Sequence, residues 1–145
     1  MRDAYIVESV RTPGCKNRRG QFKDTRPEEL LSHILKSCVE KAGIDPVVID
    51  DVMCGCAFSE GEQGLIIGRI AGKMAGFPDT TSGATVNRFC SSGLEAIALA
   101  SLRIQAGWSE VTMGAGIESM TFVPMGGHMP RPLAEYAASN PEAYI

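Results

Sequence analysis

Long apolar runs are absent from this 145-residue sequence, and none approaches the ~20 consecutive residues that a membrane-spanning helix needs. Runs of Lys or Arg are absent too, and the net charge is −3, so neither a membrane nor a nucleic acid is expected as a partner. The amino-terminal residues have neither the layout of a signal peptide nor that of an Arg-rich and Ser-rich transit segment. These absences favour a cytoplasmic protein.

Histidine and paired cysteine motifs are also scarce. The sequence has two histidines, and its five cysteines show no spacing typical of a disulfide framework. Cys54 and Cys56 lie two residues apart in an apolar segment, but neither His33 nor His128 has the spacing that would complete a metal site with them. No metal is therefore expected, and Cys54, Cys56 and Cys38 are predicted to be small buried side chains.

The composition is that of a globular domain with a sizeable core, because 44% of the residues are hydrophobic and 21% are charged. Strand-like and helical segments alternate along the chain. The predicted strands cover residues 4–10, 47–58, 81–87 and 110–118, and the predicted helices cover residues 25–42, 65–75 and 90–106. This alternation predicts an α/β fold with a largely parallel sheet.

Two of these helices have features that bear on packing. The first begins near Thr25-Arg26-Pro27-Glu28, a capping-box pattern with proline in the first turn, and Gly43 is its expected C-cap. The helix over residues 90–106 carries only Glu95 and Arg103 as charges, so we expect it to be buried on nearly all sides. Its outer side then needs either a second half of the fold or an oligomer interface.

Cys90 is the predicted catalytic residue. It lies in Asn87-Arg88-Phe89-Cys90-Ser91-Ser92-Gly93, between a predicted strand and the start of the apolar helix. The first N–H groups of a helix have no intrahelical acceptor, and the helix dipole places partial positive charge at that end. Both effects favour a thiolate, the nucleophilic form of cysteine. The residues alone also fit a cysteine hydrolase or a redox-sensing thiol. Cys15 lies in a basic loop with no base or helix end evident beside it, so no role is predicted for it.

Three further segments have plain structural interpretations. Glu60-Gly61-Glu62-Gln63-Gly64 is predicted to be a solvated turn, since clustered Gly and Glu usually form loops. Gly114-Ala115-Gly116 lacks the third glycine of a dinucleotide fingerprint, whose place Ser119 occupies, so nucleotide binding is not expected there. Glu118 and Ser119 are expected to fix the loop that leaves the last strand, and a place for the acidic side chain near an active-site floor stays open.

Four segments, taken in order, resemble the thiolase family. They are Ile6–Pro13, Glu60–Gly64, Asn87–Gly93 and Gly114–Met120, and the resemblance runs from about residue 4 to the end of the chain. The Asn-Arg-x-Cys-Ser-Ser-Gly form is closer to degradative 3-ketoacyl-CoA thiolases than to the biosynthetic acetoacetyl-CoA branch.

The resemblance implies a particular architecture. The chain would be the N-terminal half of a five-layer αβαβα fold with a mixed, mostly parallel sheet. Residues 1–118 would form this half with its nucleophile helix, and residues 119–145 would begin the loop domain that shapes the coenzyme A site. The resemblance also implies a homodimer or homotetramer, with the strand before Cys90 pairing across the interface. Coenzyme A would be a substrate, and no bound cofactor is implied.

The implied reaction is thiolytic cleavage of a 3-ketoacyl-CoA to acetyl-CoA and a shortened acyl-CoA, as in fatty acid β-oxidation, through an acyl group on Cys90. The backbone N–H of Cys90 itself would supply one donor of the oxyanion hole. The alternatives are a biosynthetic acetyl-CoA C-acetyltransferase and a non-catalytic structural or dimerisation module derived from a thiolase.

Three segments that the family uses for catalysis have no counterpart in these residues. They are the Gly-His-Pro histidine that activates the nucleophile, the Cys-x-Gly-x-Gly cysteine that acts as acid and base, and the Asn-Glu-Ala-Phe segment that holds a water. His128 lacks the Gly-His-Pro order, so a surface or interface role is expected for it. The 145 residues are therefore expected to be an incomplete and inactive part of an enzyme.

Overall fold

A parallel three-stranded sheet forms the centre of the molecule. The computed structural model describes residues 2–127. Its strands are β1 (Asp51–Gly55), β2 (Ser82–Val86) and β3 (Thr112–Gly116), and its helices are α1 (Pro27–Ala42), α2 (Ile67–Met74) and α3 (Ser92–Gln105), with short 3-10 turns η1 (Pro46–Val48) and η2 (Gly61–Gln63). The strand order is β2-β1-β3, and both pairs are parallel. The predicted α/β fold with a parallel sheet is confirmed.

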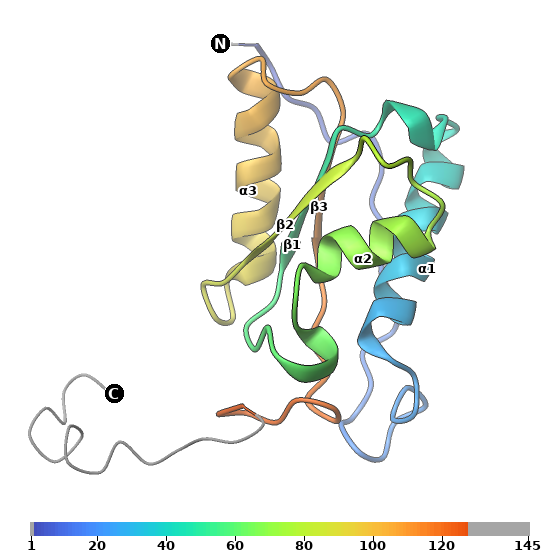
Figure 1. Cartoon of the computed structure of the whole chain (residues 1–145), viewed down its shortest axis with the longest axis vertical. Coiled ribbons are helices and arrows are strands. Elements are labelled where there is room, and N and C mark those ends of the chain that lie inside the picture. Colours follow the sequence, from blue (N-terminus) through green and yellow to red (C-terminus); the bar gives the residue numbers. More distant parts are fainter. Residues whose placement is uncertain (1, 128–145) are drawn as a thin grey trace, which may run out of the picture.

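Helices cover both faces of the sheet. In Figure 1, α1 and α2 lie on one side and α3 lies alone on the other. The larger core cluster joins α1 and α2 to the first face, and a smaller cluster of Met53, Ala96 and Ala100 joins α3 to the second. Every residue of β1 is buried, as expected for the central strand of a parallel sheet with both faces covered. No helix among residues 2–127 is long and apolar enough to cross a membrane.

The ends of α1 agree only in part with the prediction. Gly43 is the C-cap, with a left-handed φ of +66°, and its N–H donates to the Glu40 carbonyl oxygen. The capping box is absent, because the N-cap is Arg26 and no side chain caps the helix there. Proline disfavours helical geometry at the residue before it, so Arg26 stays extended and the helix begins at Pro27.

The predicted strand over residues 4–10 is not formed. The structure assigns no strand to this segment, and Tyr5, Ile6 and Val7 are each at least 75% exposed. A strand needs a neighbour to take its backbone hydrogen bonds, and the sheet among the described residues ends at β2 and β3. Apolar content alone therefore did not decide a place in the sheet for this segment.

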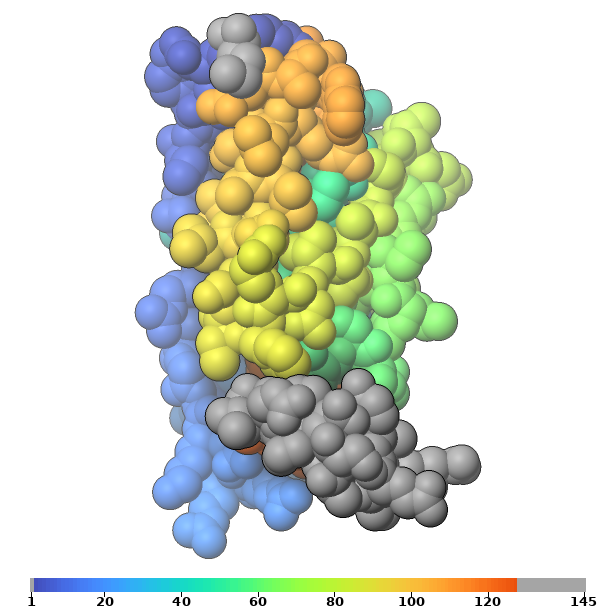
Figure 2. Space-filling model, turned by 90° about the vertical axis from the view of Figure 1, so that its left-hand side faces the viewer, coloured from blue at the N-terminus to red at the C-terminus, as the bar shows by residue number. Residues whose placement is uncertain are grey.

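The helix predicted to be buried on nearly all sides has an open outer face. Ser92, Ala96 and Ala100 of α3 are buried, whereas Leu94 is 71% exposed and Leu102 is 52% exposed. Figure 2, which looks onto this side of the molecule, shows α3 side chains forming part of the surface. Only the sheet side of α3 is covered by the residues that the structure describes, so the expected second neighbour is not among them.

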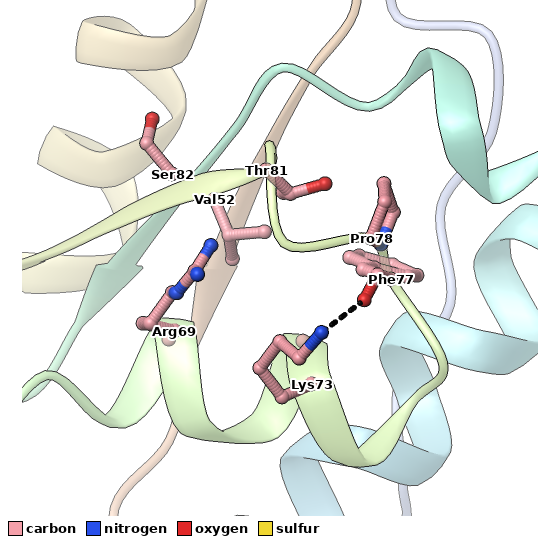
Figure 3. Close-up of a pocket in the computed structure, with 9 residues that line it drawn as sticks. Val52, Arg69, Lys73, Phe77, Pro78, Thr81 and Ser82 are labelled. Atoms are coloured by element: carbon pink, nitrogen blue, oxygen red, sulfur yellow. Dashed lines mark hydrogen bonds between the residues drawn. The ribbon is translucent and has the colours of Figure 1, made fainter.

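A shallow crevice between α2 and the sheet is closed by polar contacts within the fold (Figure 3). The Lys73 ammonium donates to the Phe77 carbonyl oxygen at 3.1 Å and pairs with the Asp79 carboxylate at 2.6 Å. Arg69 donates to the Asp79 carbonyl oxygen at 3.0 Å. Both cations therefore bind groups of the loop that follows α2, and these contacts fix the end of the helix.

Candidate active site

The carboxyl ends of β1 and β3 and the start of α3 surround a cavity of about 580 Å³. Ligands of parallel α/β folds bind at this edge of the sheet, beyond the carboxyl ends of the strands. Apolar side chains make up most of the wall, and the polar groups in it are Cys90, Ser92 and Glu118. The full lining is Gly55, Ala57, Phe58, Phe89, Cys90, Ser92, Gly93, Gly116, Ile117, Glu118, Met120 and Met125.

Cys90 lies in the turn that joins β2 to α3 and is exposed at this cavity. The N-cap of α3 is Ser91, so the helix begins at Ser92 and Cys90 stands one residue before the cap. The helix thus starts two residues later than predicted. The sequence correctly places Cys90 beside the helix end, and the predicted stabilisation of its thiolate by the helix stays a prediction.

Hydrogen bonds hold the backbone of this turn in an unusual form. Phe89 has a φ of +47°, in the left-handed region that non-glycine residues rarely adopt. The Asn87 Oδ1 accepts the Phe89 N–H at 2.8 Å, which is an Asx turn, and the Asn87 Nδ2 donates to the Ala57 carbonyl oxygen at 2.7 Å. Asn87 therefore ties the turn before Cys90 to the loop that follows β1.

Ser92 and an ion pair fix the other side of the turn. The Ser92 hydroxyl accepts the Arg88 N–H at 2.9 Å and donates to the Phe89 carbonyl oxygen at 2.6 Å. The Arg88 guanidinium pairs with the Glu95 carboxylate at 2.9 Å, one turn into α3. These contacts fix the conformation of the turn that connects β2 to α3.

Glycine at the end of β1 allows α3 to approach the sheet. A Cβ on Gly55 would lie 2.3 Å from the backbone carbon of Ser92 and 2.5 Å from the nitrogen of Gly93. A Cβ on Gly93, in contrast, would have no neighbour within 4 Å. Close packing therefore depends on Gly55, which the sequence did not single out, and Gly93 keeps space open at the cavity.

Glu118 lines the cavity and is held by Gln63. One Glu118 oxygen accepts from the Gln63 side-chain amide at 2.8 Å, and the other accepts the Ala57 N–H at 2.7 Å. Gln63 also donates to the Phe58 carbonyl oxygen at 3.0 Å and accepts the Ser119 N–H. The prediction that Glu118 and Ser119 fix the departing loop is supported by these bonds.

The solvated turn predicted over residues 60–64 is wrong for Gln63, which has no exposed surface. Its burial depends on Glu118, which follows 55 residues later in the chain. A local pattern of Gly and Glu contains no information about that distant partner.

The remaining cysteines differ from Cys90 in burial. Cys54 and Cys56 are buried, as predicted, and burial, with a smaller effect of nearby Glu118, raises the pKa of Cys54 to about 12 and that of Cys56 to about 11. Burial also raises the pKa of Cys38, which is only half-buried, and Cys15 is exposed. No group of side chains within residues 2–127 has the arrangement of a metal site.

His33 is exposed on α1 and does not line the cavity. His128 lies outside the described residues, as do residues 128–145 of the predicted loop domain.

The sequence matches a family model over most of its length. Residues 4–141 match the model of the thiolase N-terminal domain. The chain belongs to the thiolase family. Among its thiolase relatives, the peroxisomal 3-ketoacyl-CoA thiolase 5 of Arabidopsis thaliana is 43% identical over 143 residues, which cover 97% of this chain and 30% of the relative. The 3-ketoacyl-CoA thiolase of Bacillus subtilis is 42% identical over 145 residues, covering 100% of this chain and 37% of the relative.

A solved thiolase-fold structure is also similar. The acetyl-CoA acetyltransferase of Bacillus anthracis superimposes with a TM-score of 0.79 at 36% identity, covering 83% of this chain and 30% of that one. The predicted thiolase-like fold is thereby confirmed for this half. The chain spans about a third of the length of the thiolases it matches, with 30% and 37% covered in the two relatives above.

Proposed function

We propose that this chain carries the nucleophile of an acyltransferase that cleaves 3-ketoacyl-CoA thioesters. The observation that carries this proposal is the position of Cys90, exposed at the cavity where β1, β3 and α3 meet. Cys54 and Cys56 are unsuitable nucleophiles because they are buried and their pKa values are raised to about 12 and about 11. Cys90 belongs to the motif that resembles the nucleophile segment of the family.

The proposed chemistry has two covalent steps. The Cys90 thiolate attacks the ketone carbon, and the bond between that carbon and its neighbour in the acetyl-CoA portion breaks. The electron pair goes to the departing carbon, which takes up a proton, so that acetyl-CoA leaves and a thioester remains on Cys90. The thiolate of a second coenzyme A then attacks this thioester, releasing the shortened acyl-CoA and restoring the Cys90 thiolate.

The cavity wall suits an acyl chain. Phe58 and Phe89 meet edge to face with ring centroids 6.2 Å apart, and Ile117, Met120 and Met125 continue the apolar lining. A mostly apolar wall with few polar groups is the usual form of a small-molecule site. Coenzyme A enters this scheme as a substrate, and the proposal requires no resident cofactor or metal.

The degradative reaction is the first choice between the two thiolase activities. The relatives reported above are named 3-ketoacyl-CoA thiolases, and the Asn-Arg-x-Cys-Ser-Ser-Gly form of residues 87–93 points the same way. The similar solved structure is an acetyl-CoA acetyltransferase, which keeps the biosynthetic reaction as the second candidate.

We infer that these 145 residues alone do not complete the catalytic cycle. Protons must be removed and supplied during both steps, and no histidine from residues 2–127 lines the cavity. β2 is an edge strand of the described sheet, which supports pairing of this strand across a homodimer or homotetramer interface. The cytoplasmic location and the domain boundary at residues 118 and 119 stay predictions, as does the alternative of a non-catalytic dimerisation module.

The experiment that tests the proposed function is transfer of an acetyl group from acetyl-CoA to the purified chain. Peptide mass spectrometry should find the group on Cys90 and not on Cys15, the other exposed cysteine, and Cys90→Ser should abolish it. Thiolysis of acetoacetyl-CoA by the same chain should be negligible. Equal acetylation of Cys15 and Cys90 would remove the case for a nucleophile at Cys90, and an ordinary turnover rate would refute the inferred incompleteness.

A further inference from the structure

The cavity-lining side chain of Glu118 is linked to the turn that carries Cys90. We propose that Glu118, held by Gln63, is a positioning residue that fixes this turn through the Ala57 peptide group and the Asn87 side chain. The importance of the turn rests on the proposed role of Cys90 as the nucleophile. The link itself consists of hydrogen bonds within the described residues.

The first part of the link is the orientation of the Glu118 carboxylate. Both oxygens accept a hydrogen bond from the protein, one from Gln63 at 2.8 Å and one from the Ala57 N–H at 2.7 Å. Gln63 is fully buried and is itself held by the Phe58 carbonyl oxygen and the Ser119 N–H. Hydrogen bonds to a carboxylate are stronger than those between neutral groups, so this arrangement defines the position of the Ala57 peptide.

The second part is Ala57, whose backbone N–H and carbonyl oxygen bind two different side chains. Its N–H donates to Glu118 and its carbonyl oxygen accepts from the Asn87 Nδ2 at 2.7 Å. Successive hydrogen bonds of this kind polarise and strengthen one another. The orientation of the Asn87 amide therefore depends on where Glu118 holds Ala57.

The third part is the strained backbone next to Cys90. The Asn87 Oδ1 accepts the Phe89 N–H at 2.8 Å, and Phe89 has a φ of +47°. Such a conformation persists only when its surroundings impose it. Arg88 and Ser92 also contribute to the turn, so loss of the Glu118 link should loosen it without abolishing it.

A purely electrostatic role for Glu118 predicts the opposite effect on Cys90. Glu118 lines the same cavity, and a nearby carboxylate disfavours a thiolate by repulsion between like charges. Removing only this repulsion would make Cys90 more reactive, whereas loosening the turn would move the thiol away from its place beside the helix start and make it less reactive. The sign of the change therefore separates the two roles.

The test is the pH dependence of iodoacetamide alkylation at Cys90 in the full 145-residue chain, with Cys15 as the internal reference. Glu118→Gln should slow Cys90 alkylation relative to Cys15 by about tenfold near neutral pH, since a charge-assisted bond is lost. Glu110→Gln is the matched control, because this exposed carboxylate precedes β3 and lies outside the link, and should leave the profile unchanged.

Asn87→Ala provides a second, independent entry to the same link. It should slow Cys90 alkylation to a similar degree, and adding Glu118→Gln should slow it little further, because both changes break one chain of contacts. Protection of the fully buried Cys54 from alkylation, with an unchanged far-UV circular dichroism spectrum, reports that each variant is folded. If Glu118→Gln does not fold, Gln63→Met replaces it, because this change removes the amide that orients the Glu118 carboxylate and leaves Asn87 intact, and Cys90 alkylation should slow in the same way.

Unchanged or faster Cys90 alkylation in the folded variants would overturn the positioning role, as would full additivity of the two changes. Acetyl transfer to Cys90 is measured separately. Failure of acetyl transfer with intact coupling would refute the proposed function alone, and normal acetyl transfer with no coupling would refute only the role of Glu118.

Discussion

Two glycines of the site should respond to alanine in opposite ways. A Cβ on Gly55 would lie 2.3 Å from a backbone carbon of α3, whereas ordinary contacts begin near 3.4 Å, so the helix start would have to move by about 1.1 Å. The neighbouring atoms are backbone and cannot rotate away. Gly55→Ala should therefore cost about 3 kcal/mol, the upper end of overpacking penalties. Gly93 lies in α3, and a Cβ there would have no neighbour within 4 Å. Because alanine is favoured over glycine in a helix, Gly93→Ala should be neutral or should stabilise the fold by up to about 1 kcal/mol.

The assay is thermal and urea unfolding of the two variants and the parent chain, followed by far-UV circular dichroism. For a chain of this size, a loss of about 3 kcal/mol lowers Tm by roughly 6–12 °C. Gly55→Ala should also change the alkylation rate of Cys90, since the displaced helix start adjoins that turn. An unchanged Tm for Gly55→Ala, or an equal loss in Gly93→Ala, would refute the argument that Gly55 permits the close approach of the α3 start.

Three further outcomes are expected. Iodoacetamide at neutral pH should label Cys90 in the folded chain while Cys54 and Cys56 stay protected until denaturant is added; equal labelling of all three would contradict their burial. The free energy of unfolding should fall as pH rises from about 9 toward 11. The folded state keeps the Cys54 and Cys56 thiols protonated, with pKa values of about 12 and about 11, whereas the unfolded state ionises them near 9.0. The loss at pH 10 is about 1.4 kcal/mol per thiol. Replacing both thiols with alanine should flatten urea-unfolding stability over this range, and an equally steep fall in that variant would exclude them as the cause. Arg103→Met should lower the free energy of unfolding by about 3 kcal/mol, because it leaves the buried Asp51 carboxylate without the guanidinium that lies 2.7 Å away. Adding Asp51→Val to the same chain should recover much of this loss in chemical denaturation. No recovery would show that the unpaired charge of Asp51 is not the cause of the loss.

Local patterns predicted the elements of this fold well where the local backbone determines them. The helical stripe and Gly43 of α1, the alternation that gives a parallel sheet, and the position of Cys90 beside a helix start all follow from nearest neighbours in the chain. The start of α1 was misplaced by two residues because Pro27 restricts Arg26 more strongly than the capping pattern favours Thr25.

Features that depend on distant residues were predicted poorly. The apolar segment at residues 4–10 gave no information about whether a strand would be available to pair with it, and the described sheet provides none. The apolar circumference of α3 indicated a need for neighbours, but only one of its faces is covered by residues 2–127. In both cases the sequence specifies a tendency to be buried, and the tertiary structure decides which segment, if any, covers the apolar side chains.

The sequence by itself determined that a cysteine would stand at the junction of a strand and a helix in an α/β domain, because periodicity and turn residues act over a few positions. Only the tertiary structure decided that Gly55 would admit the helix start, that Gln63 would be buried, and that Glu118 would reach the Ala57 peptide. The physical reason is that close approach, burial and hydrogen-bond partners are relations between segments 37 to 61 residues apart in the chain, which no local pattern encodes.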